Sequence, residues 1–116
     1  MFPASGEAQE WSAMLRTELT SWPKVRTRPM FGMTGVYRGS KIFACLPKSR
    51  TLGWSPNSFL MKFHKASPLL ERRIAADPDL NRSRAGALGW TSFEMKSSEQ
   101  IPQLLTWLQL AYGSAR

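Results

Sequence analysis

Apolar residues recur every three or four positions near the start of the chain, which is the spacing of an amphipathic helix. They predict a helix over residues 7–21, and Pro23 ends it. The apolar stripe of this helix consists of Ala8, Trp11, Met14, Leu15, Leu19 and Trp22. We expect residues 1–6 to form a loose tail and the proline-bracketed segment 22–29 to form an extended connector.

From Met30 the apolar period changes to two, which predicts strands over 30–38 and 41–46. Gly39-Ser40 joins them, because glycine at the first position of a two-residue loop favours a type II′ turn. The predicted cross-strand pairs are Tyr37/Ile42, Gly35/Ala44, Met33/Leu46, Val36/Phe43, Thr34/Cys45 and Arg38/Lys41. Because the last pair brings two like charges together, we expect it to be solvated or to meet an anion.

The second half of the chain continues with two strands and two helices. A loop over 47–58 is followed by a strand over 58–65. Ser67-Pro68 begins a helix that Asp77-Pro78 ends, and a loop over 79–89 leads to a strand over 91–96. The last helix stops at Gly113, and its apolar stripe consists of Ile101, Leu104, Leu105, Leu108 and Tyr112. The order α-β-β-β-α-β-α predicts a single α+β domain over 1–116, with helices packed on an antiparallel sheet. The residues that we expect in its core are Phe31, Tyr37, Phe59, Phe63, Phe93 and Leu105.

Composition narrows the possible classes of protein. One cysteine and one histidine among 116 residues exclude an internal disulfide framework and the common zinc sites. No apolar run approaches the ~18 residues of a membrane span, and the N-terminus lacks the basic start of a signal peptide. We therefore expect a cytoplasmic protein without a membrane partner, a metal or another cofactor.

The net charge of +8 is unevenly distributed. No acidic residue lies between Glu18 and Glu71, and this stretch contains nine lysines and arginines. Such an excess favours an anionic partner, either nucleic acid or an acidic protein; the alternative is that the cations simply ring the surface. The candidate anion-binding residues are Arg26, Arg28, Arg38, Lys41, Lys48, Arg50 and Lys62.

No motif indicates catalysis. His64 lies in the acid-free stretch, where nothing local orients it, and Cys45 is expected to be buried in a strand. No phosphate-binding loop motif is present, so we expect a protein that is not an enzyme. Trp54 follows Lys48 and Arg50, a pattern that can stack bases, although a tryptophan in a loop more often anchors that loop.

The segment 28–46 resembles the N-terminal domain of the TfoX/Sxy competence regulators. The shared pattern Arg-x-Met-Phe-Gly…Gly-x-Tyr…Phe-Ala falls on Arg28, Met30, Phe31, Gly32, Gly35, Tyr37, Phe43 and Ala44. The segments 87–95 and 104–112 are similar to the related YjbR/MmcQ proteins. The resemblance implies an α+β fold related to type III secretion chaperones and brings no catalytic residues. Many members carry a second glycine where Met33 stands, and the motif glycines also have a structural interpretation, as a bulge or a place of close packing.

Two functions follow from these observations. The first is a basic regulatory module that binds nucleic acid or an acidic partner. The second is a homodimeric adaptor or chaperone-like protein-interaction module that does not bind nucleic acid. Apolar residues on both faces of the 30–46 hairpin favour homodimerisation, because a small domain has few helices to cover them.

Overall fold

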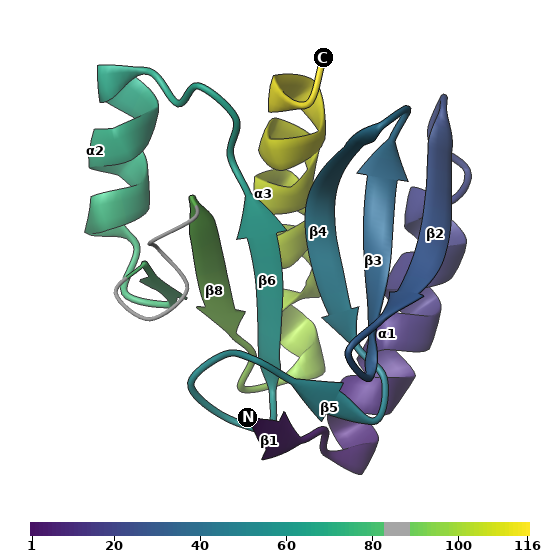
Figure 1. The fold of residues 1–116 in the computed structure, drawn as a ribbon. Helices are drawn as coiled ribbons and strands as arrows, with labels where there is room; N and C mark the ends of the chain where they lie inside the picture. Colours follow the sequence, from purple (N-terminus) through teal and green to yellow (C-terminus); the bar gives the residue numbers. More distant parts are fainter. Residues whose placement is uncertain (83–88) are drawn as a thin grey trace.

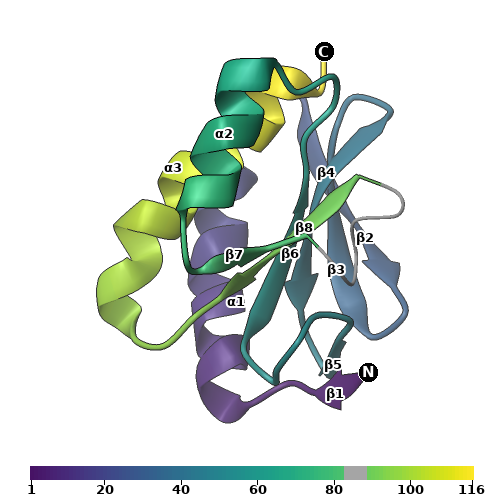
Figure 2. The same ribbon diagram turned by 90° about the vertical axis from the view of Figure 1, so that its left-hand side faces the viewer.

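The fold is known from a computed structural model that describes residues 1–82 and 89–116. Its helices are α1 (Gly6–Leu19), α2 (Pro68–Ala76) and α3 (Ile101–Ser114), the last preceded by a 3-10 turn over Ser98–Gln100. All three helices lie on one side of an antiparallel sheet, as Figures 1 and 2 show from two directions. The expected α+β class, with helices packed on an antiparallel sheet, is confirmed.

The main sheet has six strands. Their order across the sheet is β2 (Val25–Met30), β3 (Met33–Arg38), β4 (Lys41–Pro47), β6 (Ser58–Lys62), β8 (Trp90–Glu94) and β7 (Leu80–Asn81). Every neighbouring pair is antiparallel. A second, two-stranded sheet pairs β1 (Phe2–Pro3) with β5 (Arg50–Thr51). The segment 1–6, expected as a loose tail, is therefore anchored by strand pairing.

Serine hydroxyls cap the first two helices: α1 runs over Gly6–Leu19 where 7–21 was predicted, and the start of α2 at Ser67-Pro68 is confirmed. The Ser5 hydroxyl accepts a hydrogen bond from the Ala8 backbone N–H and caps α1, at 3.0 Å. The Ser67 hydroxyl accepts one from the Leu70 N–H at 3.1 Å, with Pro68 in the first turn of α2. The predicted end of α3 at Gly113 is one residue early, since the helix continues to Ser114.

The main core lies between the helices and the sheet. Phe59 and Phe93 are fully buried and directly paired across β6 and β8. Phe63 is also buried and meets the Trp107 ring edge to face, with ring centroids 6.1 Å apart. The predicted burial of these three phenylalanines is confirmed. Tyr37 and Leu105 are only half-buried.

The expected connector at 22–29 is wrong, because 25–30 forms the edge strand β2. Its alternation of half-buried Val25 and Thr27 with exposed Arg26 and Arg28 is the pattern of a strand. Pro29 lacks an N–H and is tolerated because an edge strand has neighbours on one side only. The prolines hid this strand from pattern analysis.

The predicted strand 30–38 is interrupted by a turn at Phe31-Gly32, which joins β2 to β3. Both residues have positive φ, 50° and 77°. The burial expected for Phe31 is wrong, because its side chain is 74% exposed at this turn. Alternation continued on both sides of the turn, through Met30 and Met33, so that the period alone did not reveal it.

Two of the six predicted β3–β4 pairs are confirmed, and the other four are wrong. Gly39 has a φ of 60° and begins the loop, and the pairs Arg38/Lys41 and Tyr37/Ile42 are confirmed. Between Tyr37 and Val36 the register shifts by one, because Phe43 is an extra, bulged residue in β4. The actual pairs there are Val36/Ala44, Gly35/Cys45, Thr34/Leu46 and Met33/Pro47. Phe43 and Ala44 consequently both belong to the core beneath the helices, an arrangement that strict alternation cannot give.

Further boundaries differ from the predictions, among them the strand expected over 91–96, which is Trp90–Glu94. The loop expected at 47–58 contains β5, and the strand expected at 58–65 ends at Lys62. The loop expected at 79–89 contains β7. Its residues 83–88, which include the start of the similar segment 87–95, lie outside the described residues.

Candidate nucleic-acid interface

The side of the sheet opposite the helices, here called the open face, carries side chains from β2, β3, β4, β6 and β8. Strand alternation assigns them, because Val25 and Val36 pack into the core beneath the helices and their neighbours point the other way. The open face has a small apolar cluster of its own, in which Met33, Cys45 and Leu60 are buried. Its half-buried members are Met30, Ile42 and Trp90.

Cations and aromatic rings lie side by side across this face. Arg26 stands opposite Tyr37 in the β2–β3 ladder, and Tyr37 stands opposite Ile42 in the β3–β4 ladder. On the other side of β4, Lys62 stands opposite Trp90, with its Nζ 5.9 Å from the centroid of that ring. The ladders thus arrange arginine, tyrosine, lysine and tryptophan across the sheet.

Gly35 provides the space for this arrangement. It is buried in the centre of the face, and a Cβ there would lie 3.3 Å from the Tyr37 ring and 3.3 Å from Ile42 Cδ1. The Tyr37 ring therefore lies close over the Gly35 backbone. This geometry favours the structural interpretation of the motif glycine as a place of close packing.

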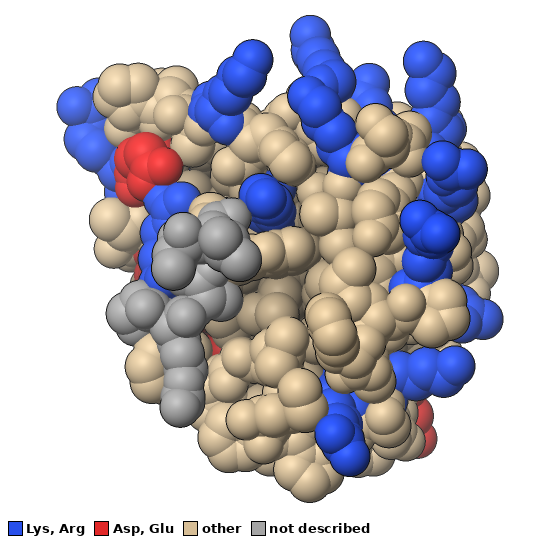
Figure 3. Space-filling model, viewed as in Figure 1, with Lys and Arg blue, Asp and Glu red and all other residues tan. Residues whose placement is uncertain are grey.

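The surface charge follows the rim of the open face. Figure 3 shows most of the lysines and arginines along its upper and right-hand margins, with others farther inside the face and at its lower end, and few acidic atoms in view. Arg26 and Arg28 are exposed, and neither forms an ion pair within the ranges 1–82 and 89–116. Both side chains are free to meet an external anion.

Arg38 and Lys41, at the β3–β4 loop, belong to the other side of the sheet. Arg38 Nη1 donates to the backbone carbonyl of Tyr112 at 2.9 Å, and Lys41 Nζ donates to that of Arg116. Their like charges therefore meet the carbonyl oxygens at the end of α3. Arg38 is half-buried and acts as a structural residue.

Lys48 and Arg50 follow the opposite end of β4. The strand separates Lys48 from Lys41 by seven residues, which corresponds to about 23 Å. Arg50 is exposed and its Nη1 lies 3.7 Å from Met1 Sδ. The seven candidate cations thus occupy three places, and only Arg26, Arg28 and Lys62 share the open face.

Phe31 is a further candidate for this interface, although the sequence pattern had predicted a buried side chain. Its turn is held by the Gly32 carbonyl, which accepts hydrogen bonds from Ser49 N at 2.9 Å and Arg50 N at 3.0 Å. A large aromatic side chain displayed on a fixed turn, close to arginines, suits contact with a partner. The signal in the sequence was the dipeptide Phe31-Gly32 between two methionines, which can be a two-residue loop as well as part of a strand.

Cys45, His64 and Trp54, the other chemically distinctive residues, lie in three different environments. Burial raises the pKa of the Cys45 thiol to about 12, so this cysteine is a poor nucleophile. His64, for which no orienting group was expected, has its Nε2 2.8 Å from the Ile42 carbonyl oxygen. Trp54 lies exposed in the loop between β5 and β6.

Among 1–82 and 89–116, no group of three histidine, cysteine, aspartate or glutamate side chains could hold a metal ion. Within the same ranges, no helix has the length and apolar character needed to cross a membrane.

Comparison with known proteins gave no match to a protein-family model, to a curated protein or to a solved structure. The resemblance of 28–46 to the TfoX N-terminal domain therefore has only the sequence pattern from Arg28 to Ala44 as its support.

Proposed function

We propose that this protein is a non-enzymatic regulatory domain that binds single-stranded nucleic acid on its open face. The observation that supports this most is the placement of Arg26 beside Tyr37 and of Lys62 beside Trp90, on the sheet face opposite the three helices of residues 1–82 and 89–116. Proteins that bind single strands combine cations for the phosphates with aromatic rings for the bases. A sheet face offers both along one surface.

A flat sheet face suits a single strand better than a duplex. Reading the major groove takes a helix or a two-stranded ribbon that projects into it, whereas an open sheet meets bases that are already unstacked. The basic character of the rim would attract the strand, and exposed Phe31 extends the aromatic surface beyond the end of β2. We expect little sequence preference, since stacking tolerates any base.

The test is fluorescence anisotropy of a labelled single-stranded oligonucleotide, with a duplex of equal length as comparison, across a salt series. Arg26→Gln with Arg28→Gln should weaken binding and flatten the salt dependence by up to about 1.4 log–log units, about 0.7 for each phosphate contact on a single strand. Tyr37→Leu, which keeps an apolar side chain over Gly35, should weaken binding about fivefold or more through lost stacking.

The matched control is Arg72→Gln with Arg73→Gln, which removes the same charge from the exposed side of α2. It should retain the affinity of the wild-type protein. If the two double variants lose affinity equally, net charge explains the binding and the open face does not. Binding weaker than about 100 μM at low salt would reject nucleic acid as the partner.

The second candidate function is that of a homodimeric interaction module. It is favoured by the apolar cluster of the open face, in which Met30, Ile42 and Trp90 are only half-buried. A two-fold contact would cover these side chains. A dimer mass by light scattering at high micromolar concentration, together with no oligonucleotide binding, would favour this second function.

A further inference from the structure

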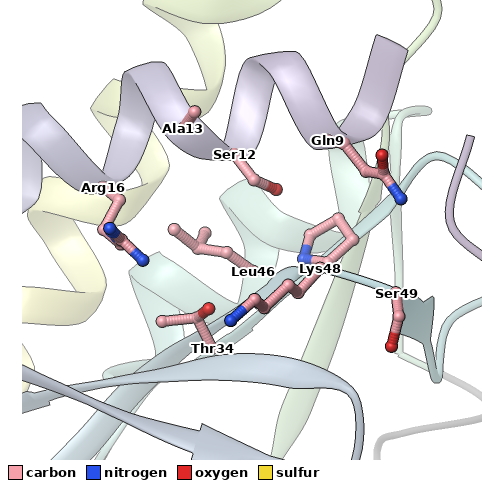
Figure 4. Close-up of a pocket in the computed structure, with 9 residues that line it drawn as sticks. Gln9, Ser12, Ala13, Arg16, Thr34, Leu46, Lys48 and Ser49 are labelled. Atoms are coloured by element: carbon pink, nitrogen blue, oxygen red, sulfur yellow. The ribbon is translucent and has the colours of Figure 1, made fainter. Parts of the chain in front are cut away.

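A cavity of about 380 Å³ lies between α1 and the ends of β3 and β4. It is on the helix-covered side of the sheet, because Leu46 in its wall belongs to the core beneath the helices. Figure 4 shows the polar side chains that border it, from α1 on one side and from the sheet and the segment after β4 on the other. The cavity is thus a separate site from the open face.

Ser12 brings an unpaired hydroxyl to this cavity. The residue is only 8% exposed, and its Oγ has no hydrogen-bond partner in the part of the chain that the structure describes. Figure 4 shows the hydroxyl directed from α1 into the space. A buried hydroxyl without a partner is unfavourable, so a ligand oxygen in the cavity would satisfy it.

Two cations face the same space. Figure 4 shows the side chains of Arg16 and Lys48 reaching into the space from opposite sides, and Thr34 lines it as well. No aspartate or glutamate lines the cavity, and neither cation is in an ion pair within the described ranges. Two facing positive charges repel each other, and an anion between them would attract both and offset that repulsion.

We propose that this cavity binds a small phosphomonoester, with the phosphate between Arg16 and Lys48. Arginine presents paired N–H donors to phosphate oxygens, and lysine adds a point charge. A phosphomonoester carries about −1.5 to −2 charges at pH 7, which matches two cations on one group better than a single carboxylate does. Ser12 and Thr34 donate to the remaining oxygens, and Leu46 with the methyl of Ala13 borders the apolar part of the ligand.

Two sources could present this group, a free small molecule and the 5′-phosphorylated end of a nucleic acid. The shared chemistry is the phosphomonoester, and the pocket requires no contact with the open face. Failure of nucleic-acid binding on the open face therefore leaves this proposal intact, and the reverse also holds.

The test measures binding of phenyl phosphate, inorganic phosphate and benzoate by isothermal titration calorimetry. Phenyl phosphate should bind most tightly, because it combines the dianion with an apolar body. Arg16→Gln and Lys48→Gln should each weaken its binding about tenfold, a loss typical of a charge-assisted contact. The matched control Arg72→Gln, on the exposed side of α2, should bind as the wild type does.

Ser12→Ala separates binding from folding. Because the hydroxyl has no partner in the described protein, its removal should leave the melting temperature of the unliganded protein unchanged or higher. The same variant should bind phenyl phosphate more weakly, by about threefold or more. A merely structural serine would show the opposite pattern, with lower stability and unchanged affinity.

Several results would overturn the proposal. The first is the absence of saturable binding up to about 10 mM phenyl phosphate. The second is that Arg16→Gln and Arg72→Gln weaken phenyl phosphate binding equally. The third is that benzoate binds as tightly as phenyl phosphate. A single-stranded oligonucleotide with and without a 5′-phosphate identifies the source. Tighter binding of the phosphorylated end that is lost in Arg16→Gln assigns the pocket to a nucleic-acid terminus, and equal binding assigns it to a free phosphomonoester.

Discussion

Arg38 lies over the ring of Tyr112, with its Cζ 4.3 Å from the ring centroid, and its Nη1 donates 2.9 Å to the carbonyl oxygen of the same residue. One side chain thus connects the β3–β4 hairpin to the end of α3 by a cation–π contact and a charge-assisted hydrogen bond. Tyr112 in turn meets the Trp22 and Phe43 rings edge to face, and its hydroxyl donates to the Pro23 carbonyl oxygen. Through these contacts Arg38 stabilises the packing of the hairpin against α3.

We therefore expect Arg38→Ala to lower the free energy of unfolding by about 2 kcal/mol, through the lost charged hydrogen bond and ring contact. Arg38→Lys should recover only part of this stability. The planar guanidinium can stack on the ring while one of its N–H groups donates to the carbonyl oxygen, whereas an ammonium group is a compact point charge that cannot stack. Urea unfolding of both variants measures the change. Lys24→Ala, an exposed residue of the same charge, is the control and should stay within about 0.5 kcal/mol. A similarly small loss in Arg38→Ala would contradict the structural role.

Gly32 and Gly39 provide a matched pair of glycines with positive φ. At Gly32 an added Cβ would lie 2.9 Å from Ser49 Oγ and 3.2 Å from two carbons of Arg50, whereas at Gly39 it would meet nothing within 4 Å. Backbone strain alone costs about 1–2 kcal/mol in the left-handed region.

We expect Gly39→Ala to lower the free energy of unfolding by roughly that amount and Gly32→Ala to lower it more. The added Cβ at Gly32 also pushes the 48–50 segment away from its hydrogen bonds to the Gly32 carbonyl. Thermal and urea unfolding of the two variants give the comparison. Equal losses would mean that the close approach at Gly32 relaxes without penalty.

The two glycines also show how far the sequence predicts the fold. Gly39 begins a loop between two alternating strands, and both the loop and its nearest register pair followed from the pattern. Gly32 interrupts an apparently continuous alternation, so the turn that it makes was invisible. The bulge at Phe43 was hidden for the same reason, because a one-residue insertion in a ladder depends on what both strands pack against.

The candidate site was predictable only as a set of residue types. The acid-free stretch identified Arg26, Arg28 and Lys62 among the cations, but which cations share a face depends on strand register and on whether 25–30 is a strand at all. Arg38 could not be separated from them, since its partner at Tyr112 is 74 residues away along the chain. The unpaired hydroxyl of Ser12 likewise emerges only when α1 is placed over β3 and β4.

Phe31 and Phe63 should respond oppositely to truncation. Phe63 is buried against Trp107, so Phe63→Ala should lower the free energy of unfolding by roughly 3–5 kcal/mol. Phe31 is 74% exposed, so Phe31→Ala should change it by no more than about 0.5 kcal/mol.

The effects of the two changes on nucleic-acid binding should have the opposite order. At low temperature, where both variants are folded, Phe31→Ala should weaken binding of a single-stranded oligonucleotide while Phe63→Ala retains it. Denaturant unfolding and fluorescence anisotropy on the same samples measure both quantities. A strongly destabilised Phe31→Ala would return this residue to the core and remove it from the proposed interface.

Asp79 should make part of the stability depend on acid pH. Its carboxylate accepts hydrogen bonds from Lys96 Nζ at 2.8 Å, Gln100 Nε2 at 3.0 Å and Gln103 Nε2 at 3.3 Å. The hydrogen bond from Lys96 is the main cause that lowers the pKa of Asp79 below its usual value, against the opposing effect of burial. Folding therefore favours the charged carboxylate.

The sign of the pH dependence follows from linkage. Because the pKa of Asp79 is lower in the folded than in the unfolded chain, its stabilising contribution is complete above the ordinary carboxyl pKa of about 4 and is lost as the pH falls through the lower folded value. We expect Asp79→Asn to be less stable than the wild type by a constant amount from about pH 7 to pH 5, and the difference to shrink below about pH 4. Urea unfolding at pH 7, 5, 4 and 3 tests this, with exposed Glu99→Gln as the control for removal of one negative charge. A difference between Asp79→Asn and the wild type that persists unchanged at the lowest pH would show that the hydrogen bonds, and not the charge, provide the stabilisation.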